Sequence, residues 1–226
     1  MQERIHKILE ITDLKDMLKK SGELYGDKSA YRFKTEEPGK FKIITHKEYR
    51  EMVDALGTAF IKLGLKGKRI AVIGENRYEW GLSYLAIACG TGIVVPLDKA
   101  LPENEIKSLI ERSEVEAICY SKKYDESMKK FKSECVGNLK HLISMDLEKH
   151  EDGVYSLKEL IERGKELIKE GDRNFLDAKI DAEKMGMLLF TSGTTSTSKA
   201  VELSHKIICT NLMDIASVLQ INENDT

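Results

Sequence analysis

The chain has little proline and few aromatic residues: it contains three prolines, and Phe, Trp and Tyr make up 7% of its 226 residues. With 41% hydrophobic residues, this scarcity of proline excludes a disordered or proline-rich chain and indicates a folded globular protein. An excess of either charge is also missing, because 36 basic and 38 acidic residues leave a formal net charge of -2. This balance indicates no basic face for nucleic acid or an anionic membrane, so we expect no nucleic-acid partner.

Long apolar runs are absent as well. The N-terminal stretch MQERIHKILEITDLK is interrupted by charges, unlike a secretory signal, and no apolar run reaches membrane-spanning length. The four cysteines lack C-x-x-C or zinc-finger spacing, and each lies in or beside an apolar stretch. We therefore predict reduced, buried thiols in a cytoplasmic protein without a transmembrane segment. These cysteines are Cys89, Cys119, Cys135 and Cys209.

The sequence does contain a regular alternation of short apolar runs and amphipathic segments. The apolar runs are continuous and do not alternate in polarity, which is typical of strands buried on both faces. The pattern therefore predicts an α/β fold with a mostly parallel sheet flanked by helices on both faces. Strands are predicted at 69–74, 93–97, 116–120, 141–145 and 185–190, with helices at 77–91, from Pro102, and in the charged segment after residue 120.

Local signals place the remaining elements. A helix is predicted at 13–25, and a hairpin region at about 29–45 is centred on Pro38-Gly39. A polar segment at 169–184 is predicted to be a surface loop, and 200–204 a returning strand. The final helix has an apolar stripe at Ile208, Leu212, Ile215 and Leu219. Capping boxes are predicted for the pairs Thr45 and Glu48, Asn76 and Glu79, and Ser156 and Glu159.

One loop has an unusual composition. Residues 191–199 read TSGTTSTSK, an uninterrupted run of Thr, Ser and Gly that ends at a lysine. Closely spaced backbone N–H groups and hydroxyls suit the oxygens of a polyphosphate, and the lysine adds a positive charge. The P-loop pattern G-x-x-x-x-G-K-[ST] does not fit, because Ser198 precedes Lys199 and Ala200 follows it. A flexible linker is disfavoured, because threonine is stiff and strands bracket the loop closely.

The stretch TSGTTSTSKAVELSH resembles the phosphate-loop signature of the adenylate-forming superfamily, whose usual form is T-S-G-T-T-G-x-P-K-G. Twelve residues, Leu188 to Lys199, fit the permissive version of that signature. Residues 45–102 look like the helix and strand series that opens the large domain of these enzymes, and VVPLDKALP matches a second characteristic segment. The start, DLKDMLKKSGELYGDKSAYRF, is most similar to long-chain fatty acyl-CoA synthetases.

This resemblance implies a function and assigns roles to residues. In the family, the loop holds the β- and γ-phosphates of ATP while a carboxylate attacks the α-phosphorus, and coenzyme A then displaces AMP. Lys199 would neutralise charge on the departing pyrophosphate. The implied cofactors are ATP, Mg²⁺ and coenzyme A, with a fatty acid as the carboxylate substrate. The cofactor-binding residues would be Thr191, Ser192, Gly193, Thr194, Thr195, Ser196 and Lys199.

The sequence departs from the family pattern in composition and in length. Ser196, Ser198 and Ala200 stand where the family more often has Gly, Pro and Gly, and a serine with positive φ at 196 would cost about 1 kcal/mol. Family members are much longer and continue into a small C-terminal domain with the adenylation lysine. Residues 1–226 are therefore expected to form the N-terminal portion of the adenylation domain, with the C-terminal domain absent.

Two functional hypotheses follow. The first is an N-terminal fragment of an ATP-dependent carboxylate–CoA ligase, inactive in isolation, that self-associates through the face left open by truncation. The second is a naturally truncated remnant that binds a nucleotide or a partner without catalysis. No catalytic or metal-binding residue is assigned in this chain.

Other conspicuous side chains have structural explanations. His205 is predicted to begin the last helix after an N-cap at Ser204, Glu202 to lie on an outward strand face, and Asp98 to form a turn. His46, His141 and His150 are too dispersed to indicate a metal site.

Overall fold

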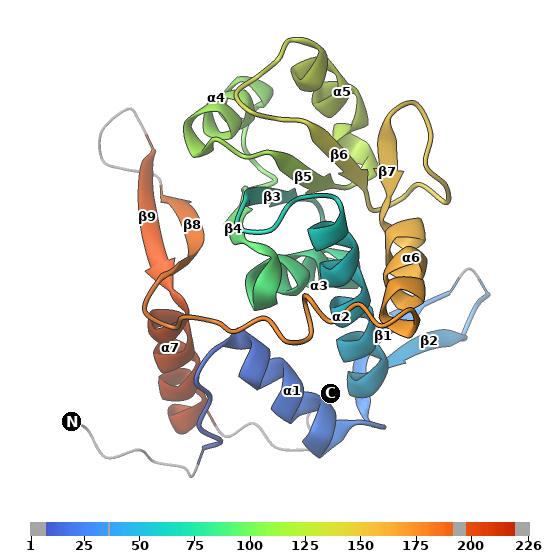
Figure 1. Cartoon of the computed structure of the whole chain (residues 1–226), viewed down its shortest axis with the longest axis vertical. Helices are drawn as coiled ribbons and strands as arrows, with labels where there is room; N and C mark the ends of the chain where they lie inside the picture. The colour runs from blue at the N-terminus through green and yellow to red at the C-terminus, as the bar shows by residue number, and fades with distance from the viewer. Residues whose placement is uncertain (1–7, 36, 192–197, 220–226) are drawn as a thin grey trace.

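A seven-stranded sheet forms the centre of the computed structural model, which describes residues 8–35, 37–191 and 198–219 (Figure 1). The strand order is β7-β6-β5-β3-β4-β8-β9, and every neighbouring pair is parallel except β8 and β9. The predicted α/β class with a mostly parallel sheet is confirmed. The strands are β3 (Arg69–Ile73), β4 (Ile93–Pro96), β5 (Ala117–Tyr120), β6 (His141–Ser144), β7 (Val154–Ser156), β8 (Met185–Thr191) and β9 (Lys199–Ser204).

Helices cover both faces of this sheet. Alternate residues of β3 show the division, because Ile70 and Val72 face one core while Ala71 and Ile73 face the other. The first core is covered by α1, α2, α3 and α6, and the second by α4 and α5 (Figure 1). The helices are α1 (Leu14–Tyr25), α2 (His46–Lys62), α3 (Tyr78–Ala86), α4 (Glu103–Ser113), α5 (Asp125–Ser133), α6 (Leu157–Lys169) and α7 (His205–Val218), with a 3-10 turn at Lys122–Tyr124.

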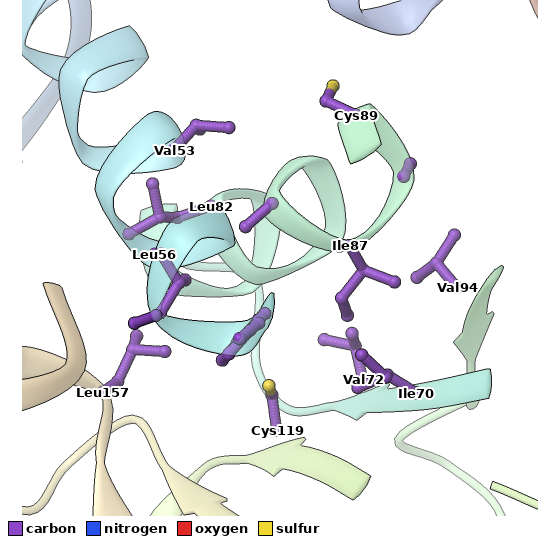
Figure 2. Close-up of a cluster of buried hydrophobic side chains, with 14 of the residues drawn as sticks. Val53, Leu56, Ile70, Val72, Leu82, Ile87, Cys89, Val94, Cys119 and Leu157 are labelled. Atoms are coloured by element: carbon purple, nitrogen blue, oxygen red, sulfur yellow. The ribbon is translucent and has the colours of Figure 1, made fainter. Parts of the chain in front are cut away.

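Helix α2 is the centre of the first core. Its start is fixed by the predicted capping box, in which Thr45 Oγ1 accepts from the Glu48 N–H and Glu48 accepts from the Thr45 N–H. Val53 and Leu56 point from α2 into the core drawn in Figure 2, where Leu82 of α3 and Val94 of β4 are also seen. On another side, α6 approaches so closely that Gly164 lies against the backbone of Ala55. The two helices therefore pack backbone to backbone at this point.

The predicted hairpin forms a separate two-stranded sheet of β1 (Ser29–Lys34) and β2 (Phe41–Thr45). Tyr31 and Phe33 turn towards the first core, and the Phe33 ring stacks on the Tyr78 ring with centroids 5.3 Å apart. An isolated two-strand hairpin is marginally stable in water, so these aromatic contacts hold it on the domain. In Figure 1 the hairpin projects on the side of the molecule opposite to β8 and β9.

Of the other two predicted capping boxes, the one at Asn76 is wrong and the one at Ser156 is half correct. Arg77, and not Asn76, is the N-cap of α3, and it makes no side-chain cap hydrogen bond. Its Nε instead donates to Glu79 at 2.7 Å, so Glu79 is an ion-pair partner. For α6, Ser156 Oγ accepts from the Glu159 N–H as predicted, but the Glu159 carboxylate accepts from the backbone of His150.

The helix predicted at 77–91 is also interrupted. Helix α3 ends at Ala86, and a π-helical segment, Ile87–Thr91, follows it. Gly90 in that segment has φ 148°, a backbone conformation that favours glycine, so the regular helix cannot continue through it. The hydroxyl of Thr91 donates to the Ala86 carbonyl at 2.8 Å and satisfies one acceptor left by the change of helix type.

The segment predicted to be a surface loop contributes to the core. Phe175 is fully buried and lies so close to Gly57 of α2 that there is no room for a side chain at that glycine. Lys15 of α1 holds the segment in place by donating to the carbonyls of Phe175, Leu176 and Ala178 at 2.6–3.0 Å. Burial lowers the pKa of Lys15, although nearby carboxylates oppose the shift.

The cysteine prediction is correct for three residues and wrong for one. Cys89, Cys119 and Cys209 are buried, while Cys135 is exposed in the turn after α5, with φ 54°. All four are free thiols. Burial raises the pKa of Cys119 to about 12 and that of Cys209 to about 11, so both are protonated at neutral pH.

Candidate functional site

The β8–β9 hairpin carries the loop that the sequence singles out. Strand β8 joins the sheet parallel to β4, with Met187 beside Val94. The middle of β8 is buried, because its consecutive apolar residues Met187 and Leu188 pack into the two cores. Strand β9 returns antiparallel, and its last pair is Thr191 with Lys199. The chain therefore leaves the sheet at Thr191, at the carboxyl edge of the parallel strands, and re-enters at Lys199 directly opposite. In open α/β sheets ligands bind outside this edge.

The structure describes two of the seven predicted loop residues. Thr191 and Lys199 are both exposed at the mouth of the hairpin, as a phosphate-binding role requires. Within the described part of the chain, the Lys199 ammonium has no ion-pair partner, so its charge is available to an anion. Ser192, Gly193, Thr194, Thr195 and Ser196 lie outside the described residues, and the phosphate-binding assignment of all seven residues stays a prediction.

Arg112 adds a second cation to this edge. It lies in the last turn of α4, and its Nη2 donates to the Ser198 carbonyl at 2.7 Å. Its guanidinium also lies 5.5 Å from the centre of the Phe190 ring, a cation–π contact with β8. Arg112 thus holds both sides of the hairpin mouth. Sequence reasoning missed it, because a basic residue at a helix end carries no signal of a contact across 86 positions.

The base of the hairpin is fixed to the N-terminal helix through His205. Ser204 caps α7 as predicted, with its Oγ accepting from the Ile207 N–H at 3.3 Å, while His205 is only 3% exposed. The ring lies against Gly186 of β8, where an added Cβ would come within 2.6 Å of it. Its Nδ1 accepts from the Leu14 N–H at 3.3 Å. Burial lowers the pKa of His205, which favours the neutral ring that this bond requires.

The other polar residues considered in the sequence make ordinary structural contacts or face outward. Glu202 is exposed on β9, and the Asp98 carboxylate accepts from the Ala100 N–H at 2.9 Å in a turn. His141 and His150 both lie against the Tyr155 ring, with centroids 5.9 and 4.9 Å away. Among the described residues, no three His, Cys, Asp or Glu side chains are grouped to hold a metal ion.

A pocket lined by aromatic side chains lies elsewhere. It has a volume of about 740 Å³ and is lined by Tyr31, Phe33, Tyr78 and Trp80, between the β1–β2 hairpin and the start of α3. A smaller pocket of about 390 Å³ lies at the base of the β8–β9 hairpin, beside Met185 and Leu203. In the described parts of the chain, no helix is both long enough and apolar enough to cross a bilayer.

Several large apolar side chains of β9 and α7 are exposed. The predicted stripe of the last helix is exposed at Leu212, Ile215 and Leu219, whereas Ile208 packs against the first core. Single exposed apolar residues are ordinary, but several large ones on two neighbouring elements mark an interaction surface. We call this group the α7–β9 surface: Val201, Ile207, Leu212, Ile215, Val218 and Leu219.

Known proteins share both sequence and fold with the chain. It is 26% identical to fatty acyl-CoA synthetase B of Dictyostelium discoideum, over 96% of the chain and 33% of that protein. It is 27% identical to long chain acyl-CoA synthetase 1 of Arabidopsis thaliana, over 89% of the chain and 32% of that protein. The chain thus spans about a third of the length of these relatives.

Solved structures confirm the fold. A long-chain-fatty-acid-CoA ligase from Archaeoglobus fulgidus superimposes with a TM-score of 0.78 at 18% identity, over 99% of the chain and 43% of that structure. The N-terminal domain of FACL13 from Mycobacterium tuberculosis gives a TM-score of 0.73 at 17% identity, over 95% of the chain and 50% of that structure. The family model described as "AMP-binding enzyme" matches residues 18–226, and the chain therefore belongs to the AMP-binding enzyme family.

Proposed function

We propose that this chain is the N-terminal portion of an ATP-dependent fatty acid–CoA ligase, which activates a carboxylate as acyl-AMP before forming the thioester. The observation that carries the proposal is a Thr, Ser and Gly segment that starts at Thr191 and ends at Lys199, at the carboxyl edge of the parallel strands in a chain of the AMP-binding family. Lys199 has no ion-pair partner among the described residues. Both the relatives' names and the one-third coverage support a longer ligase. A C-terminal domain that follows these residues in the whole protein, and a cytoplasmic location, are part of this proposal.

In this proposal, the loop binds the β- and γ-phosphates of ATP. The backbone and hydroxyls of residues 191–196 donate to phosphate oxygens, and Lys199 neutralises the charge that develops on the departing pyrophosphate. Arg112 has a positioning role, because it fixes the Ser198 carbonyl next to Lys199. A preorganised cation accelerates phosphoryl chemistry because it needs no rearrangement when charge appears.

The remaining reactants fit this chain to different extents. Mg²⁺ would arrive with the ATP phosphates, since the described residues offer no cluster of metal ligands. Coenzyme A and the acyl substrate would complete the reaction in the whole enzyme. No described residue is assigned to either of them, and fatty acid as the substrate class rests on the names of the relatives.

The α7–β9 surface supports the ligase portion over a stand-alone binding module. A module that functions alone would bury or replace exposed apolar side chains such as Ile215 and Val218. In the proposal, this surface packs against the rest of the enzyme, and in the isolated chain it mediates self-association. The non-catalytic module predicts instead a monomer, or a closed dimer, that binds nucleotide without turnover.

The test uses the complete protein with Lys199→Ala and a matched control, Lys179→Ala. Lys179 is also an exposed lysine without an ion-pair partner in the described ranges, but it lies in the 170–184 segment, outside the β8–β9 hairpin. We expect Lys199→Ala to slow adenylate formation, measured by pyrophosphate release, by about 100-fold. Thioester formation from supplied acyl-adenylate should change little, and the control should match wild type in both steps.

Two results would refute this assignment. Equal slowing of both half-reactions by Lys199→Ala would remove Lys199 from the pyrophosphate site. Robust acyl-CoA formation by the isolated 226-residue chain with ATP, Mg²⁺, coenzyme A and a fatty acid would refute the claim that the missing portion is required.

A further inference from the structure

The β1–β2 hairpin has two chemically different faces. In the register of the two strands, Arg32 is opposite Ile43 and Lys34 is opposite Phe41. Neighbouring positions along each strand point to opposite faces, and Tyr31 and Phe33 point inward. The outward side chains are therefore two cations and two apolar groups, paired across the strands. We call Arg32, Lys34, Phe41 and Ile43 the outer ribbon face.

All four side chains of this face are exposed. Phe41 is 44% exposed and Ile43 is 52% exposed, which are high values for large apolar residues. The Arg32 guanidinium lies 4.1 Å from the centre of the Phe41 ring. Neither Arg32 nor Lys34 has an ion-pair partner among the residues that the structure describes. Within the described ranges, the positive charges of this face are thus uncompensated, and its apolar groups are uncovered.

The outer ribbon face is separate from the other exposed apolar surface. The α7–β9 surface lies on the opposite side of the molecule, so a partner that covers it leaves the ribbon open (Figure 1). Two further exposed apolar residues, Leu24 and Tyr25, lie at the end of α1, which leads directly into β1. The Tyr25 ring contacts His46, the residue that follows β2, at 5.7 Å between centroids. The exposed apolar groups of the hairpin region therefore include the end of α1.

We propose that the outer ribbon face docks on the surface of an anionic lipid bilayer. Phe41 and Ile43 enter the boundary between headgroups and acyl chains, while Arg32 and Lys34 bind lipid phosphates beside them. The cation–π contact lets Arg32 remain close to the aromatic ring while it meets a headgroup. Charge complementarity selects a lipid surface here, because two cations flank the apolar pair and neither has an ion-pair partner among the described residues.

Net charge could not reveal this surface. The whole chain is close to neutral, and its formal charge of -2 gives no long-range attraction to an anionic membrane. The attraction instead comes from a local group that the hairpin register assembles. Docking is independent of the ligase reaction, so vesicle binding can fail or succeed whether or not the proposed function holds.

The experiment measures co-sedimentation of the 226-residue chain with vesicles. One set is phosphatidylcholine alone, and the other contains added phosphatidylglycerol. Three proteins are compared: wild type, the double variant Arg32→Glu/Lys34→Glu, and the matched control Lys62→Glu/Lys66→Glu. Lys62 and Lys66 are both exposed: Lys62 is the last residue of the 17-residue helix α2, about 25 Å from the hairpin, and Lys66 lies in the turn that follows it. A further variant, Phe41→Ser/Ile43→Ser, removes the apolar pair, and circular dichroism confirms that each variant is folded.

We expect wild type and the matched control to bind the anionic vesicles, with binding reduced by added salt. Arg32→Glu/Lys34→Glu should weaken binding by about tenfold or more, and Phe41→Ser/Ile43→Ser should weaken it as well. Equal binding to neutral vesicles would assign the interaction to the α7–β9 surface and overturn the proposal. Undiminished binding by the charge-reversed variant, or no binding by wild type to either vesicle, would also overturn it.

Discussion

The contact between α2 and α6 gives the sharpest stability prediction. Gly164 faces the backbone of α2, and a Cβ at this position would lie 1.8 Å from the Ala55 carbonyl oxygen. Ordinary van der Waals contact begins at 3.4 Å, so Gly164→Ala forces the helices apart by about 1.6 Å. The obstacle is backbone, which cannot turn aside as a side chain can. We therefore take the upper end of overpacking costs, about 3 kcal/mol.

Helix propensity opposes this cost but does not cancel it. Replacing glycine by alanine in a helix favours folding by about 1 kcal/mol, which leaves a net loss of about 2 kcal/mol. For a chain of this size, that loss corresponds to a decrease in Tm of about 4–8 °C, measured by differential scanning calorimetry. The matched control is Gly22→Ala in α1, where the new Cβ meets only the movable Arg50 side chain. The control should be neutral or stabilising, and a Gly164→Ala variant as stable as wild type would refute the packing argument.

Two further predictions concern titratable groups. Iodoacetamide should modify Cys135 in the native protein and spare Cys89, Cys119 and Cys209, as peptide mass spectrometry can show; rapid labelling of a buried thiol would contradict the packing. Because burial lowers the pKa of His205, the unfolded chain binds a proton first, so stability should fall as pH decreases below 6.5. In His205→Asn, the urea midpoint should change less with pH between about pH 7 and pH 5 than it does in wild type. An unchanged pH dependence would show that the His205 ring is not its cause.

Periodic features of the sequence predict most of the fold. The strands β3 to β6 are continuous apolar runs, and the Thr45 capping box begins α2 where the pattern places it. Strand β7 was missed because it has only three residues, too few for an alternation to be visible. Phe175 was assigned to the surface because its neighbours are polar. Its burial depends on the small residue Gly57 on α2, more than a hundred positions away in sequence.

The candidate site was predictable where chemistry is local and not where it depends on tertiary contacts. Thr191 and Lys199 stand at the two ends of a segment whose Thr, Ser and Gly content suits phosphate binding, and the hairpin places them opposite each other. Arg112 reaches the site from α4, and no residue near it in sequence indicates that contact. The buried position of His205 likewise depends on Gly186 and Leu14, which the chain brings together only after folding.

The strand order also determines when each part of the chain can assemble during synthesis. Strands β3 to β7 lie within residues 69–156 and form one continuous block of the sheet. Strand β8 does not extend the block beside β7 but adds to β4 at the opposite edge. A chain that leaves the ribosome from its N-terminus can therefore complete five parallel strands before β8 emerges. The hairpin that presents Lys199 is added last, to an edge that is already formed.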